Sequence, residues 1–164
     1  MRIIGIDPGL SGGIAILENN KIKEIFDMPV MADGKKNKRQ LNSALLAQLI
    51  KDSIKDIDDS VIVVEQVNAM PGQGVTSMFN FGQTFGAIKG ICAALNLPIF
   101  FVRPAKWKKH FELINSSKDA SRTKVIEMYP SIAEKLSKKK DVNKSDAILI
   151  AKYYSETGFK EDSK

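Results

Sequence analysis

Internal disulfide bonds and thiolate metal clusters are excluded at once, because the 164 residues contain a single cysteine. Cys92 lies in the apolar run of residues 91–95, so we expect it to be a small core residue. Histidine is equally scarce. His110 is the only one, and its neighbour Phe111 favours a structural role for it over a catalytic one.

Long apolar runs are also absent. No segment approaches the roughly 20 apolar residues that a membrane helix needs. Only one basic residue separates Met1 from a strand-like run, without the longer apolar region and cleavage site of a secretory signal. We therefore expect a protein of a reducing, soluble compartment such as a cytoplasm, with no membrane partner.

The charge of the chain is basic, with a formal net charge of +6 and a pI near 9.3. Lys and Arg side chains release condensed counterions when they approach phosphates, so this charge favours a polyanionic partner such as nucleic acid. The hydrophobic fraction of 43% and the charged fraction of 27% are ordinary for a globular protein. Its length fits one compact domain, expected over residues 1–157, with a polar tail at 158–164.

Hydrophobic periodicity predicts an α/β fold. Residues 2–7 form a predicted buried strand that stops at Pro8-Gly9, and residues 14–17 and 21–26 complete an antiparallel meander. The β-branched run at 61–65 is typical of a central strand covered on both faces. A mixed sheet of five strands flanked by helices follows: three antiparallel strands, then two parallel additions. The fifth strand is expected at 98–102, and helices at 40–55, 75–95, 104–111, 119–129 and 143–155.

Three acids fall where a metal site could assemble. Asp7 ends the first predicted strand, Glu65 ends the fourth, and Asp146 opens the last helix. Singly, each has an ordinary structural explanation, since Asp before Pro-Gly is common in turns and Asp near a helix start often caps it. However, Asp7 and Glu65 both follow runs that should be buried, where an unpaired carboxylate is costly. A hard cation such as Mg²⁺, which prefers oxygen ligands, would remove that cost.

The sequence resembles the RuvC-like Holliday junction resolvases of the RNase H-like superfamily. The segments 4–15 (IGIDPGLSGGIA), 63–66 (VVEQ) and 145–151 (SDAILIA) are similar to the three motifs of that family, in its order and nearly its spacing. The resemblance implies an RNase H-like fold and an endodeoxyribonuclease that acts as a homodimer on four-way DNA. It also implies paired nicks that depend on Mg²⁺, for which Mn²⁺ substitutes, and that leave 5′-phosphate and 3′-hydroxyl ends.

By the same resemblance, Asp7, Glu65 and Asp146 correspond to the metal-binding acids of the family. A fourth acid in that family usually precedes the last aspartate by three residues, where this chain has Asn143. Asp141 is the alternative source of that charge if it lies in the loop ahead of the helix. Asn143 is alternatively a cap of that helix.

The segment from Gln66 to Phe85 directly follows a candidate catalytic acid, so it is well placed to touch DNA. In the resembled family this region lines the junction and is a candidate wedge between bases, which makes Met70, Gln73 and Phe79 candidate contacts. An equally good interpretation of the aromatic residues at 79, 81 and 85 is helix core or dimer interface.

A second candidate DNA contact is the basic stretch 103–124, with seven Lys or Arg residues against two acids. Trp107 lies among these lysines, as in the basic segment that grips DNA in RuvC-like enzymes. A solvated surface explains any one lysine, but the cluster favours phosphate contact. The candidate residues are Lys106, Lys108, Lys109, Lys118 and Arg122.

The sequence also leaves two rival functions open. An ASKHA-type nucleotide-binding domain would use Asp7-Pro8-Gly9 at a phosphate-bound metal, although such proteins usually need two lobes and more length. A non-catalytic protein that binds branched DNA would keep the fold and the basic face, and the asparagine at 143 is the reason to consider it. For the resolvase we expect a cytoplasmic, nucleoid-associated location, or the host cytoplasm if a phage encodes it.

Overall fold

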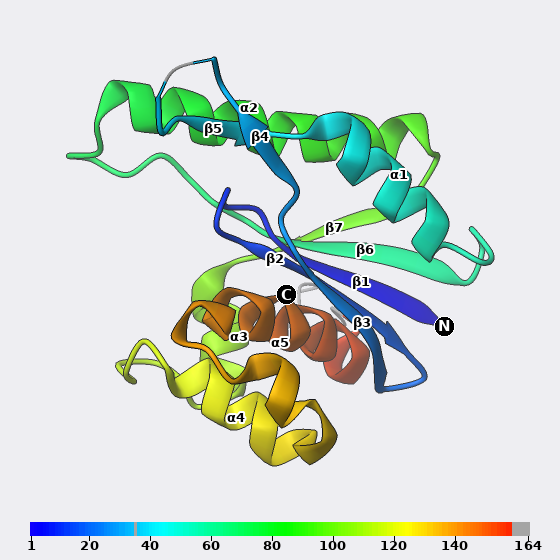
Figure 1. Ribbon diagram of the computed structural model, residues 1–164. Helices are drawn as coiled ribbons and strands as arrows, with labels where there is room; N and C mark the ends of the chain where they lie inside the picture. The colour runs from blue at the N-terminus through cyan, green and yellow to red at the C-terminus, as the bar shows by residue number, and fades with distance from the viewer. Residues whose placement is uncertain (35, 159–164) are drawn as a thin grey trace, which may run out of the picture.

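The computed structural model describes residues 1–34 and 36–158 and contains the predicted five-stranded mixed sheet (Figure 1). The strands β1, β2 and β3 form an antiparallel meander, β6 pairs parallel with β1, and β7 pairs parallel with β6. The order across the sheet is β3-β2-β1-β6-β7, which places β1 at the centre. Their bounds are β1 Arg2–Asp7, β2 Gly13–Glu18, β3 Lys21–Asp27, β6 Ser60–Glu65 and β7 Ile99–Val102.

Helices cover both faces of this sheet (Figure 1). On one face, Ile4 and Ile6 of β1 join a buried core with α1 and α2. On the other face, Ile3 joins a second core with α3, α4 and α5. Two buried faces explain why the central strands are continuous apolar runs. The helix bounds are α1 Ser43–Ser53, α2 Val75–Ala94, α3 Pro104–His110, α4 Ala120–Met128 and α5 Val142–Thr157.

Four short elements were not predicted. The strands β4 Val30–Ala32 and β5 Arg39–Leu41 pair as a hairpin around the loop expected at 33–38, and they are too short to show an alternating pattern. Helix α1 consequently begins at Ser43 rather than residue 40. Two 3₁₀ helices, η1 Pro130–Leu136 and η2 Lys139–Asp141, fill the segment before α5.

The predicted polar tail falls almost wholly outside the described residues. Helix α5 ends at Thr157, and Gly158 follows in the left-handed conformation (φ 54°) that often terminates helices. Residues 159–164 are not among those described. In the described part of the chain, no helix is long and apolar enough to span a membrane.

Two glycines let α5 lie directly on the sheet. A Cβ atom built on Gly5 of β1 would come within 2.2 Å of the Ala147 carbonyl oxygen and 2.8 Å of the Ala151 Cβ. A Cβ on Gly13 of β2 would meet the Lys144 Cα at 2.8 Å. Since any side chain at either position would push the helix outward, these glycines set how near Asp146 comes to the end of β1.

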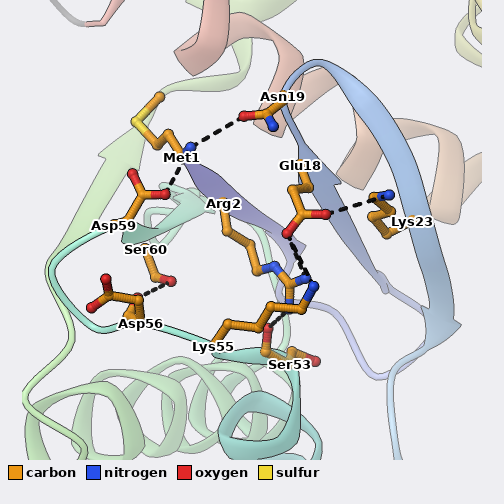
Figure 2. Close-up of polar contacts among 10 residues, drawn as sticks. All are labelled: Met1, Arg2, Glu18, Asn19, Lys23, Ser53, Lys55, Asp56, Asp59 and Ser60. Carbon is orange, nitrogen blue, oxygen red and sulfur yellow. Dashed lines mark hydrogen bonds and ion pairs between the residues drawn. The ribbon is translucent and has the colours of Figure 1, made fainter.

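An ion-pair network holds the end of the sheet where β1 begins (Figure 2). Arg2 donates to the Ser53 carbonyl and pairs with Glu18 at 2.8 Å, and Lys23 and Lys55 pair with Glu18 at 3.4 and 3.5 Å. The hydrogen bond from Arg2 is the main reason why the pKa of Glu18 falls to about 2. This network joins β1, β2 and the end of α1 at the sheet end opposite the carboxyl ends of β1 and β6.

Candidate active site

The three predicted acids meet at the carboxyl end of the central strands. Asp7 and Glu65 end the adjacent parallel strands β1 and β6, and Asp146 lies near the start of α5, which packs on β1. All three side chains are half-buried. Each is close enough to the others to act on them electrostatically. The fold therefore brings together residues that are up to 139 positions apart, between 7 and 146.

Burial and mutual repulsion disfavour the ionised forms of the three acids. Burial, then the charge of Glu65, raises the pKa of Asp7 to about 7, although the Gly9 N–H, 3.3 Å from Oδ1, acts in the opposite direction. Burial likewise raises the pKa values of Glu65 and Asp146 above their ordinary range. Three such carboxylates are poorly suited to be ionised together at neutral pH unless a cation joins them.

The donor chemistry of the cluster fits a hard divalent cation, since it offers only carboxylate oxygens. Each acid is held by a group of the protein: Asp7 by the Gly9 amide, Glu65 by the Trp107 indole at 3.1 Å, and Asp146 by the Ser121 hydroxyl. Within residues 1–34 and 36–158, no group of three or more His, Cys, Asp or Glu side chains is already arranged to hold a metal ion. The three acids thus lie in one region, but in the described residues they do not form a complete metal-binding group.

Asp141, the predicted fourth acid, has other partners. Its Oδ2 accepts the Lys138 N–H at 2.8 Å and its Oδ1 pairs with Lys144 at 2.9 Å. Burial acts to raise its pKa, but these partners outweigh burial and the pKa lies below the ordinary value. Because both oxygens are engaged, we assign Asp141 a structural role before α5 in place of a metal-binding one.

Asn143 does not cap α5, so that interpretation was wrong. The N-cap of α5 is Asp141, which makes no side-chain capping bond, and Asn143 lies within the first turn. Its side-chain amide donates to the carbonyl of Ser11 in the loop after Asp7. Asn143 therefore ties the start of α5 to the loop that follows β1.

The loop after Glu65 and the first turns of α2 present the predicted apolar contacts to solvent. Met70 is 61% exposed and Phe79 is 65% exposed. Gln73 accepts the Met70 N–H at 3.3 Å and so helps to close the loop. The helix-core interpretation holds for Phe85, whose ring lies 5.3 Å from that of Phe101, but it is wrong for Phe79.

The basic stretch divides into surface lysines and residues with other roles. Lys106, Lys109 and Lys118 are exposed, whereas Lys108 is half-buried and its charge lowers the pKa of all three acids. Arg122 makes two hydrogen bonds to Asp119, at 2.8 and 2.7 Å, and others to the carbonyls of residues 136 and 137. Its guanidinium thus holds the segment around α4, and we drop it from the candidate phosphate contacts.

Two partners of the acids were missed by sequence reasoning. Trp107 was interpreted as part of a DNA-gripping segment, but its ring is buried and its N–H points to Glu65. Ser121 gave no signal at all, because a serine in a helix is unremarkable until the fold places it beside Asp146.

The fold and the family are confirmed by comparison with known proteins. Residues 3–153 match the family model described as crossover junction endodeoxyribonuclease RuvC. The solved structure of Thermus thermophilus RuvC has a TM-score of 0.54 at 16% identity and covers 96% of this chain and 97% of that chain. The same organism's RuvC in complex with a Holliday junction substrate has a TM-score of 0.59 at 16% identity, with 96% of each chain covered.

At 16% identity, the likeness to these structures shows the fold alone. No curated protein sequence is significantly similar to the chain. The family model, in contrast, spans all three acid-bearing motifs, from the first strand to the last helix. This chain therefore belongs to the crossover junction endodeoxyribonuclease RuvC family.

Proposed function

We propose that this protein resolves Holliday junctions by paired, metal-dependent nicks in the DNA backbone. The observation that carries the proposal is the meeting of Asp7, Glu65 and Asp146 at one sheet edge, half-buried and with raised pKa values, in a chain of the RuvC family. Buried acids without a structural reason for their burial are typical of catalytic sites. The family membership also favours an endonuclease over a nucleotide-binding domain.

Asp7, Glu65 and Asp146 would hold the metal, which we propose to be Mg²⁺ with Mn²⁺ as a substitute. Divalent ions bound to such acids activate a water molecule and stabilise the leaving oxygen of a phosphodiester. The Trp107 indole and the Ser121 hydroxyl keep two of the acids oriented at the sheet edge. Lys108 adds positive charge beside them, where it can face the phosphate. Breaking the P–O3′ bond leaves 5′-phosphate and 3′-hydroxyl ends.

The DNA would lie across the acids between two surfaces. One surface consists of Met70, Gln73 and Phe79, whose apolar members are exposed and suited to unstack a base step. The other consists of the lysines of α3 and the following loop: Lys106, Lys108, Lys109 and Lys118. That a relative of the same fold is known in complex with a Holliday junction substrate supports this choice of partner.

The decisive test is cleavage of a labelled four-way junction beside a linear duplex of the same sequence, with Mg²⁺, with Mn²⁺ and with EDTA. We expect symmetric nicks on the junction only, and only with a metal. Tight binding without cutting under any metal would instead support a non-catalytic junction-binding protein.

Replacing two lysines of α3 should weaken junction binding and flatten its salt dependence. Each phosphate contact contributes about −0.9 to the slope of log K against log[salt], so Lys108→Ala with Lys109→Ala should reduce the slope by about 2. Filter binding at four salt concentrations measures this. The control is Lys21→Ala with Lys51→Ala, which removes the same charge from exposed positions on β3 and α1. Equal slopes in the two double variants would remove Lys108 and Lys109 from the interface.

We further propose that the exposed face of α2 is the homodimer surface. Gly82, Gly86 and Gly90 follow one another at four-residue spacing, and a Cβ on any of them would meet no atom within 4 Å. The same face continues through Val75 and Phe79, which are 85% and 65% exposed, so the dimer interface stays open as an alternative role for Phe79. A row of small residues allows the backbones of two helices to approach closely.

The variant Gly86→Leu should convert the dimer into a monomer, because its side chain would stand between the two helices. Sedimentation velocity measures the change at equal protein concentration. Ala44→Leu adds a leucine to the exposed side of α1 and should leave the sedimentation coefficient unchanged. A Gly86→Leu protein that still sediments as a dimer would place the interface elsewhere.

A further inference from the structure

Trp107 lies where the core, the basic helix and the acidic cluster meet. Its ring is 1% exposed and belongs to the core that also includes Phe111 and Val125. Its indole N–H, the only polar group of the side chain, donates to Glu65 Oε1 at 3.1 Å. If this position served apolar packing alone, phenylalanine or leucine would fill it. Neither would add a buried N–H that requires an acceptor.

Local geometry holds this contact in place from both ends of α3. Val102 of β7 is the sheet partner of Glu65, and α3 begins two residues later with Pro104 at its first turn. At the other end of the helix, His110 pairs with Glu156 of α5 at 2.6 Å. The helix is therefore fixed to β7 and to α5, and Trp107, between these points, reaches β6.

We infer that Trp107 is a positioning residue for the metal centre. Its indole engages one oxygen of Glu65 and so sets the orientation in which the carboxylate faces Asp7 and Asp146. The same side chain lies under Lys108, whose Nζ is 5.3 Å from the indole ring centroid. Trp107 thereby joins the orientation of a metal ligand to the position of a lysine proposed to contact DNA.

This role presupposes that Glu65 is a metal ligand, as proposed above. Partners that orient metal ligands through hydrogen bonds typically change metal affinity by about 10–100-fold when they are removed. The indole N–H is such a partner, because it is rigid, buried and directed at one carboxylate oxygen. Removing only that N–H should therefore act on metal affinity more than on the fold.

The matched pair of variants is Trp107→Phe and Phe111→Leu. The first keeps an aromatic ring and deletes the donor, and the second disturbs the same core without touching a polar group. The measurement is the Mn²⁺ concentration that gives a fixed rise of the unfolding temperature above each variant's own value in EDTA, because preferential binding to the folded state raises that temperature. We expect an increase of about 10–100-fold for Trp107→Phe and none for Phe111→Leu. Equal Mn²⁺ requirements in wild type and Trp107→Phe would overturn the positioning role.

A second readout needs no change at Trp107. Because it is the only tryptophan of the chain, tryptophan emission, excited selectively over the three tyrosines, reports on this one site. We expect Mg²⁺ to change the emission saturably in the wild type and to have no such effect in Glu65→Gln, which keeps an acceptor oxygen but loses the charge. A wild type that cuts junctions with Mg²⁺ while its emission stays constant would overturn the positioning role alone. A wild type with no metal response in cutting, stability or emission would overturn the proposed function as well.

Discussion

Asp7→Asn and Glu65→Gln should each abolish junction cutting while leaving junction affinity close to that of the wild type. Either change removes one charge from the proposed metal ligands with little change in shape. Metal ions contribute several kcal/mol to transition-state stabilisation, and each 1.4 kcal/mol is a factor of ten, so we expect losses of at least about 100-fold. Single-turnover cleavage of a labelled four-way junction, with binding measured in Ca²⁺ or EDTA, separates the two effects.

The same substitutions should not harm the metal-free fold. Since burial and neighbouring charge raise the pKa of Asp7 to about 7, neutralising it removes an unfavourable charge, and the unfolding temperature in EDTA should stay constant or rise. Asp58→Asn, in an exposed loop ahead of β6, is the control and should cut normally. Loss of folding in both active-site variants would show that the acids serve the structure instead.

Gly5→Ala should destabilise the protein by about 1–3 kcal/mol, the usual cost of forcing extra atoms into a packed core. The added methyl group would lie 2.2 Å from a backbone oxygen of α5, so the helix has to move. Because Asp146 is on that helix, cutting should also fall. Urea unfolding followed by circular dichroism measures the stability, and the cleavage assay measures the accompanying loss.

Ala44→Leu is the control for this variant. It adds side-chain atoms at an exposed position of α1, outside the packed core and the proposed dimer surface. Alanine and leucine are both strong helix formers, so this variant should keep a urea midpoint close to that of the wild type. A Gly5→Ala protein with the wild-type urea midpoint would mean that α5 is not held against β1 by close packing.

Much of the fold could be predicted because its signals are local. The continuous apolar runs of β1 and β6, the Pro8-Gly9 stop and the periodic helices each lie within a few neighbouring residues. The prediction failed where an element is too short for a pattern, as in β4 and β5 with three residues each. The 3₁₀ helices before α5 were missed because a helix with three residues per turn does not give the 3.6-residue pattern of an α-helix.

The same distinction between local signals and tertiary contacts applies to the acidic residues. Asp7 and Glu65 were identified because each follows a buried run, and Asp146 because its motif resembles that of a known family. Asp141 looked like a fourth ligand in sequence, and only the folded chain shows its pairing with Lys144 and the Lys138 amide. Arg122 is likewise a candidate phosphate contact in the sequence, whereas the structure shows its hydrogen bonds to Asp119 and to two carbonyls.

By itself, the sequence determined the order of the main strands and helices and, through its motifs, the family and the identity of the three acids, since each of these signals lies within a short segment. Only the tertiary structure decided that those acids meet and how they are held. The Trp107 bond to Glu65 joins residues 42 positions apart, and the Asn143 bond to Ser11 joins residues 132 apart. Such contacts depend on how helices pack on the sheet, and packing is set by the shapes of many side chains together rather than by any local pattern.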